Sequence, residues 1–119
     1  MNINKKIIGY CKNFYKIINF KPYEEDVISD RLIKLYQNYI FKIDINNEED
    51  VKRVKQLDYV INKYIDDFLF RKELQKEILT IKVRRDAKDV LKEIINSILK
   101  IFDRYQSGTT RVIYISRWI

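Results

Sequence analysis

The stretch from residue 48 to residue 79 limits the possible folds more than any other part of the chain. Its apolar residues recur at intervals of three or four, the period of an amphipathic helix. They are Val51, Val54, Leu57, Ile61, Ile65 and Phe68. No glycine or proline interrupts the stretch, and an unbroken helix of about 32 residues would be roughly 48 Å long. Such a helix must project from a small domain, pair with a second long helix, or break near Arg71 and Lys72.

Three other stretches have the same period: residues 3–20, a segment from about 23 to 42, and residues 87–105, which have the widest apolar face. Side-chain caps are expected at Asn47 for the long helix and at Asp86 for the last helix. The sequence therefore predicts an all-α or mainly α fold with about four antiparallel helices.

The end of the chain has a different pattern. Gly108 is expected to end the last helix, because glycine often follows a helix C-terminus. The β-branched and aromatic residues 109–119 are typical of a strand, and residues 80–84 show a shorter strand-like alternation. We expect a helical domain over 1–108 and a strand over 109–119 that pairs with another chain or partner. The residues expected at this interface are Val112, Tyr114 and Trp118, together with Tyr64 and Phe68 from the long helix.

The composition argues against an enzyme. There is no histidine, and Cys11 is the one cysteine, which excludes His-dependent triads and Cys-based zinc sites. Two glycines are too few for a phosphate-binding or dinucleotide-binding loop. The adjacent Asp66 and Asp67 would diverge by about 100° on a helix, so they do not converge on one metal ion. No catalytic residue, metal, cofactor or small-molecule substrate is expected.

The formal net charge of +7 is unevenly distributed. Residues 22–50 hold eight acidic and three basic side chains, whereas the rest of the chain is basic. The densest basic cluster is Lys82, Arg84, Arg85, Lys88 and Lys92. It lies where a short connection enters the last helix, a plausible place for contacts to phosphates or to an acidic partner. Asp86 and Asp89 reduce the positive potential of this cluster.

One family resemblance covers residues 24–113. An acidic and aromatic helix ends in Leu35-Tyr36-Gln37-Asn38-Tyr39, and a long helix follows with Gln56-Leu57, Arg71 and Ile78. A second amphipathic helix then leads to Arg111-Val112-Ile113. This order resembles the helical domain of the archaeal GINS subunits. The resemblance implies a scaffold without catalytic residues, which assembles into a tetramer and bridges a replicative helicase and a RecJ-like nuclease.

The sequence as a whole favours a non-enzymatic helical interaction or scaffold subunit, within a DNA replication or other DNA-processing assembly. We expect a homo- or hetero-oligomer in the cytoplasm, without a membrane span or a signal peptide. One alternative is a small basic nucleic-acid-binding protein, with a winged-helix-like arrangement in which a strand follows 87–105. Another is a viral or plasmid-encoded protein that binds and modulates a host factor.

Overall fold

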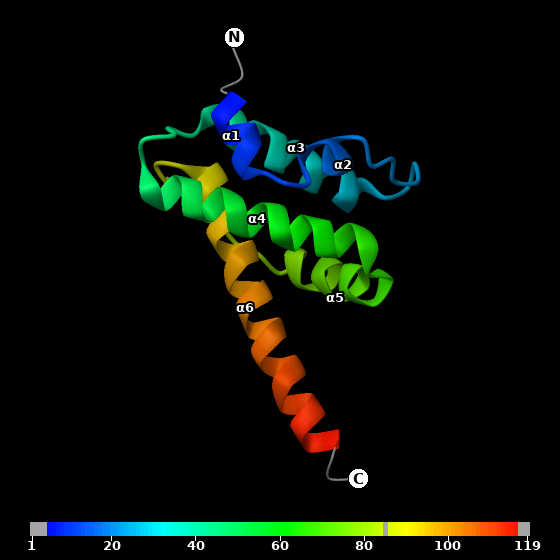
Figure 1. Ribbon diagram of the computed structural model, residues 1–119. Helices are drawn as coiled ribbons and strands as arrows, with labels where there is room; N and C mark the ends of the chain where they lie inside the picture. Colours follow the sequence, from blue (N-terminus) through cyan, green and yellow to red (C-terminus); the bar gives the residue numbers. More distant parts are fainter. Residues whose placement is uncertain (1–4, 85, 117–119) are drawn as a thin grey trace.

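Helix α4 (Glu48–Asp66) is the central element of the fold, and every other helix packs against it. The computed structural model describes the backbone of residues 5–84 and 86–116, and the side chains of residues 6–84 and 86–105. The described residues form six helices and no strand, so the prediction of an all-α fold is confirmed. The other five are α1 (Lys5–Tyr10), α2 (Phe14–Ile18), α3 (Val27–Lys42), α5 (Phe68–Ile78) and α6 (Val90–Ser116). Figure 1 shows α1, α2 and α3 on one side of α4, and α5 on the other.

The single helix expected over residues 3–20 is divided into α1 and α2. The connection between them is held against α4, where the Asp58 carboxylate accepts hydrogen bonds from the Asn13 backbone N–H and side-chain amide, at 3.2 and 3.0 Å. These bonds use a backbone donor that a continuous helix would have kept for itself. A tertiary contact therefore overrides the helical period at this position.

The long helix expected over residues 48–79 breaks at Asp67. This residue has extended backbone angles, φ −115° and ψ 105°, and its carboxylate accepts a 3.0 Å hydrogen bond from the Phe70 N–H, as the N-cap of α5. The Arg71 guanidinium donates to the carbonyls of Tyr64 and Ile65, at 3.1 and 2.5 Å. The last carbonyls of α4 are thus satisfied without a following helical turn. The chain turns back, and α5 packs beside α4 (Figure 1).

Helix α6 starts later and ends later than the sequence predicts. Asp89, not Asp86, is its N-cap, because its carboxylate accepts a 3.0 Å hydrogen bond from the Lys92 N–H. The helix then continues through Gly108 to Ser116. The predicted strand is therefore wrong over residues 109–116, as is the winged-helix-like arrangement that needed it. β-Branched residues disfavour a helix by less than about 1 kcal/mol each, and the described residues offer no strand with which this segment could pair.

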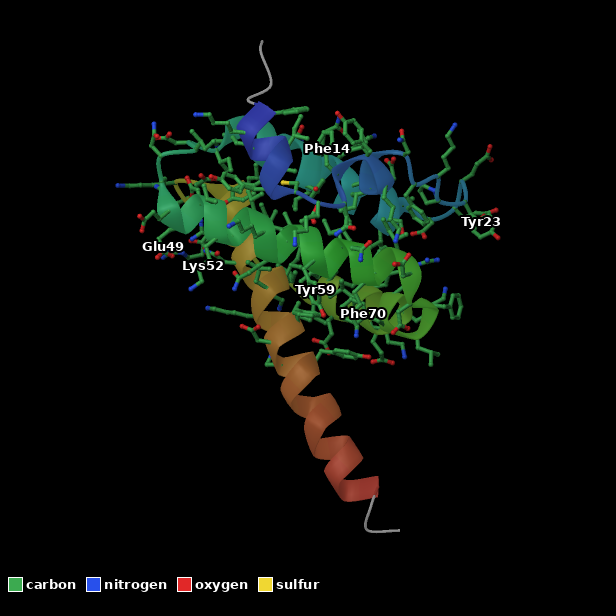
Figure 2. The ribbon with its side chains drawn as sticks, viewed as in Figure 1. Phe14, Tyr23, Glu49, Lys52, Tyr59 and Phe70 are labelled. Carbon is green, nitrogen blue, oxygen red and sulfur yellow. The ribbon has the colours of Figure 1, made fainter. Side chains whose placement is uncertain are left out.

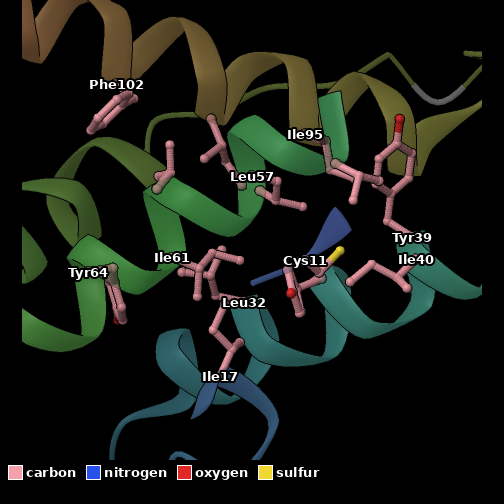
Figure 3. Close-up of a cluster of buried hydrophobic side chains, with 14 of the residues drawn as sticks. Cys11, Ile17, Leu32, Tyr39, Ile40, Leu57, Ile61, Tyr64, Ile95 and Phe102 are labelled. Atoms are coloured by element: carbon pink, nitrogen blue, oxygen red, sulfur yellow. The ribbon is translucent and has the colours of Figure 1, made fainter. Parts of the chain in front are cut away.

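The hydrophobic core lies on both sides of α4. Figure 3 shows Leu57 and Ile61 of α4 between α3 and the first half of α6, which contributes Ile95. Tyr36, Tyr64 and Phe70 are the largest side chains that are fully buried. Among the described residues, no helix combines the length and the apolar character that crossing a membrane requires.

Candidate protein-interaction site

The start of α6 is fixed to the body by one half-buried arginine. The Arg53 guanidinium pairs with Asp50 at 2.9 Å and donates to the Tyr39 hydroxyl at 3.0 Å and to the Asn96 side-chain oxygen at 2.8 Å. Its side chain is only 13% exposed, and burial raises the pKa of Tyr39. A charge-assisted network at this depth is stronger than a neutral one. It joins α3, α4 and α6 and sets the direction in which α6 leaves.

A second set of contacts holds the middle of α6. Tyr59 and Phe70, which are labelled in Figure 2, pack edge-on against Phe102 with ring centroids 5.7 and 5.6 Å apart. The Phe70 ring also lies 4.8 Å from that of Tyr105. Such aromatic pairs stabilise the packing by about 0.5–1.5 kcal/mol each beyond the burial of their area. Tyr105 is the last residue of α6 whose contacts with the body are described.

Beyond Tyr105 the backbone of α6 projects away from the body. Figure 1 shows this part of the helix extending past α5, with no other described element beside it. The overall dimensions of 55 × 31 × 27 Å reflect this extension. A 27-residue helix is about 40 Å long, longer than either of the two smaller dimensions.

The apolar row on α6 continues along the sequence into the projecting part. Ile98 and Ile101 are buried in the core, and the positions of Tyr105, Val112 and Ile115 follow them at spacings of 4, 7 and 3 residues. On a continuous helix, positions with these spacings share one face. The projecting part therefore extends the row that α6 uses to pack on the body.

Of the two interface residues predicted in the long helix, Tyr64 is buried and Phe68 is exposed. Tyr64 is 1% exposed, and its hydroxyl is hydrogen-bonded to the Ser29 hydroxyl and, at 2.8 Å, to the Gln75 amide. Tyr64 is therefore a core residue, and its assignment to an interface is wrong. Phe68 is 59% exposed, beside Leu69 at 74%, and both begin α5 at the turn after α4. An interface there stays a prediction. The side chains of Val112 and Tyr114, and all of Trp118, lie outside the described residues.

The predicted basic cluster is only partly brought together. Lys82, Arg84 and Lys88 are exposed on the connection between α5 and α6, whereas Lys92 is half-buried in the first turn of α6. Arg85 lies outside the described residues. The Arg84 guanidinium is 3.9 Å from the Asp86 carboxylate, and both side chains are more than 80% exposed.

An apolar groove is the feature that the sequence analysis missed. It has a volume of about 410 Å³ and lies between α3, the end of α5, the connection that follows, and α6. Its apolar lining comprises Ile28, Leu32, Leu35, Ile78, Leu79, Ile81, Val83, Ile94 and Ile98. The alternation over residues 80–84 was the available signal, because Ile81 and Val83 line the groove while Lys82 and Arg84 between them are exposed.

The described residues contain no group of three or more carboxylate or thiol side chains placed to hold a metal ion. Comparison of the chain with protein-family models, with curated proteins and with solved structures finds no match. The resemblance to the archaeal GINS helical domain therefore stays a prediction.

Proposed function

We propose that this chain is a non-enzymatic helical interaction module that self-associates through the projecting part of α6. The observation that carries the proposal is the continuation of α6 as a helix from Tyr105, at the edge of the body, to Ser116. The proposal agrees with the oligomer expected from the sequence, but the contact between copies is made by helices and not by paired strands.

A projecting helical segment requires a partner for physical reasons. The earlier turns of α6 supply the nucleus for this segment, so it needs only propagation. Most helical stability in proteins nevertheless comes from packing an apolar face, and no other described element lies beside this part of α6. The projecting part has 11 residues, from 106 to 116, and includes Gly108, which disfavours a helix by about 1 kcal/mol relative to alanine. The spacings of 4, 7 and 3 residues along this row keep its positions on one face, as in helices that pack along a shared seam.

The favoured partner is a second copy of the chain. Residues 106–116 contain one charged residue, Arg111, so the seam brings together few like charges although the whole chain carries +7. Homo-oligomers with two-fold symmetry are the commonest soluble assemblies, and a self-complementary face satisfies both copies at once.

The proposal is tested in the full chain with charge substitutions. Val112→Glu combined with Ile115→Glu places two carboxylates on the apolar row, whereas Ser107→Glu combined with Thr110→Glu adds the same charge at positions off that row. Light scattering should give a monomer of 14.6 kDa for the first variant and an unchanged assembly for the second. Far-UV circular dichroism checks that the body stays folded. Equal masses for the two variants would overturn the proposal.

A second candidate is direct contact with nucleic acid, favoured by the exposure of Lys82, Arg84 and Lys88 on one connection. Replacing Arg84 and Lys88 with alanine should weaken binding to duplex DNA and reduce its salt slope by about 0.9 for each phosphate that the protein no longer neutralises. DNA binding that is the same for both proteins at every salt concentration would eliminate this candidate. Membership of a DNA-processing assembly stays a prediction from the sequence.

A further inference from the structure

We infer that the groove between α3, α5 and α6 binds an acidic amphipathic helix of a partner protein. The groove lies on the body and does not involve the projecting part of α6, so the inference goes beyond self-association. It rests on two observations: the apolar lining, and the basic side chains at and beside it.

The apolar lining is aliphatic. Its three walls are α3, the end of α5 with the connection that follows it, and α6. Leu32 and Ile98 form a buried floor. Ile28 and Leu35 on α3, one helical turn on either side of Leu32, are half-buried, and Leu79 at the end of α5 is 73% exposed. An open groove of this kind accepts apolar side chains at positions i, i+3, i+4 and i+7 of a bound helix. Apolar surface left open on a folded body commonly marks such a contact.

The charged side chains at this groove are basic. Arg31 is the one charged residue in the described lining. Lys82 and Arg84 do not line the groove but are exposed on the connection, next in sequence to the lining residues Ile81 and Val83. Among the described residues no acidic side chain lines the groove. The nearest acid in the connection, Asp86, is beside Arg84, and Glu77 at the end of α5 pairs with Arg104 at 3.9 Å. Electrostatic complementarity therefore favours a helix with Asp or Glu beside its apolar face.

The C-terminal helix is not the occupant that we infer. The described part of α6 leads away from the body (Figure 1), so it does not return to the groove of the same copy. A second copy's C-terminal segment fits poorly by charge, because residues 106–119 contain Arg111 and Arg117 and no acid. The occupant that fits both the lining and the charge is an acidic segment of another protein.

The test uses a defined probe and the full chain. The probe is a fluorescein-labelled peptide with leucine at i, i+3, i+4 and i+7 on two turns and glutamate elsewhere, and its partner probe has lysine in place of each glutamate. Fluorescence anisotropy should show saturable binding of the glutamate peptide only. Leu79→Asp should weaken this binding at least tenfold, or about 1.4 kcal/mol. The matched control, Leu69→Asp, changes an equally exposed leucine (74% against 73%) that lies in the first turn of α5, outside the groove lining, and should have no effect.

A second experiment reverses the charge of two basic residues at and beside the groove. Arg31→Glu with Lys82→Glu should abolish binding of the glutamate peptide and create binding of the lysine peptide, which a merely destabilised body could not do. Equal binding of both peptides to the unmodified chain, or equal loss from Leu79→Asp and Leu69→Asp, would overturn the inference. Repeating the titration with the Val112→Glu and Ile115→Glu variant separates the two proposals, because groove binding should persist whatever happens to self-association.

Discussion

The Tyr36 hydroxyl donates a 2.5 Å hydrogen bond to the carboxylate of Asp58 in the interior of the body. Tyr36 is fully buried and Asp58 is 4% exposed. The other carboxylate oxygen accepts both bonds from Asn13, so α3, α4 and the connection between α1 and α2 meet at one acidic side chain. Burial, together with the bond to Asp58, raises the pKa of the Tyr36 phenol well above its usual range. The Tyr36 hydroxyl therefore keeps its proton and remains a donor. The contact fixes the positions of α3, α4 and the connection between α1 and α2 relative to one another.

Replacing Asp58 with alanine should strongly destabilise the fold. It leaves the Tyr36 hydroxyl and the Asn13 donors without their acceptor, and each buried donor left unsatisfied costs about 1–3 kcal/mol. We expect a loss of at least about 2 kcal/mol in urea unfolding. The matched control is Asp66→Ala on the same helix, where the carboxylate is 53% exposed and pairs with Lys16. Such a surface pair contributes about 0–1 kcal/mol, and equal losses for the two variants would contradict this account of Asp58.

A break between α4 and α5 and a continuous helix predict opposite effects of the Asp67→Ala substitution on stability. If the helix were unbroken, Asp67→Ala would stabilise it, because alanine has the highest helix propensity. Because Asp67 is the N-cap of α5, its replacement by alanine should instead lower the free energy of unfolding by about 1 kcal/mol. Thermal unfolding of Asp67→Ala beside Asp67→Asn distinguishes the cases, since asparagine also caps well. If Asp67→Ala raised the stability of the protein, the interpretation of residues 48–79 as a single long helix would be favoured instead.

The cap of α6 has a pH dependence. The Lys92 N–H bond, with Lys42 at 3.4 Å, holds the pKa of Asp89 below its usual value. A lowered folded-state pKa gives stability that is present above the unfolded value and is lost as the pH falls through the folded value. Asp89→Ala should therefore cost about 1 kcal/mol at neutral pH, and the difference from the unmodified chain should disappear in acid.

The control for that cap is Asp86→Ala. Asp86 is 83% exposed, and exposed substitutions of this kind stay within about ±0.5 kcal/mol. A larger loss from Asp86 than from Asp89 would show that the helix begins where the sequence alone suggests.

Helical periodicity predicted most of the fold because it reflects which faces are buried. Val54, Leu57 and Ile61 are all in the core, and Asn47 caps α4 as expected, accepting a hydrogen bond from the Asp50 N–H. The errors arise where a distant residue decides the local backbone. Asp58 interrupts the first helix from 45 residues away, and no local pattern contains that contact.

Two other errors concern Tyr64 and the segment after Gly108. Tyr64 lies on an apolar face, and its burial depends on Gln75 returning over it in α5, which follows only once the break at Asp67 is known. Gly108 and the β-branched residues after it are compatible with either a strand or the end of a long helix, since the difference in propensity is small. The groove was missed because its three walls come from separate elements.

The molar mass of the unmodified full chain, measured by sedimentation equilibrium at several micromolar concentrations, tests the central claim most directly. Self-association through α6 predicts a mass that approaches at least twice the 14.6 kDa of one chain as the concentration rises. A mass of 14.6 kDa at every concentration would contradict it, because the projecting helix would then be unpartnered in solution.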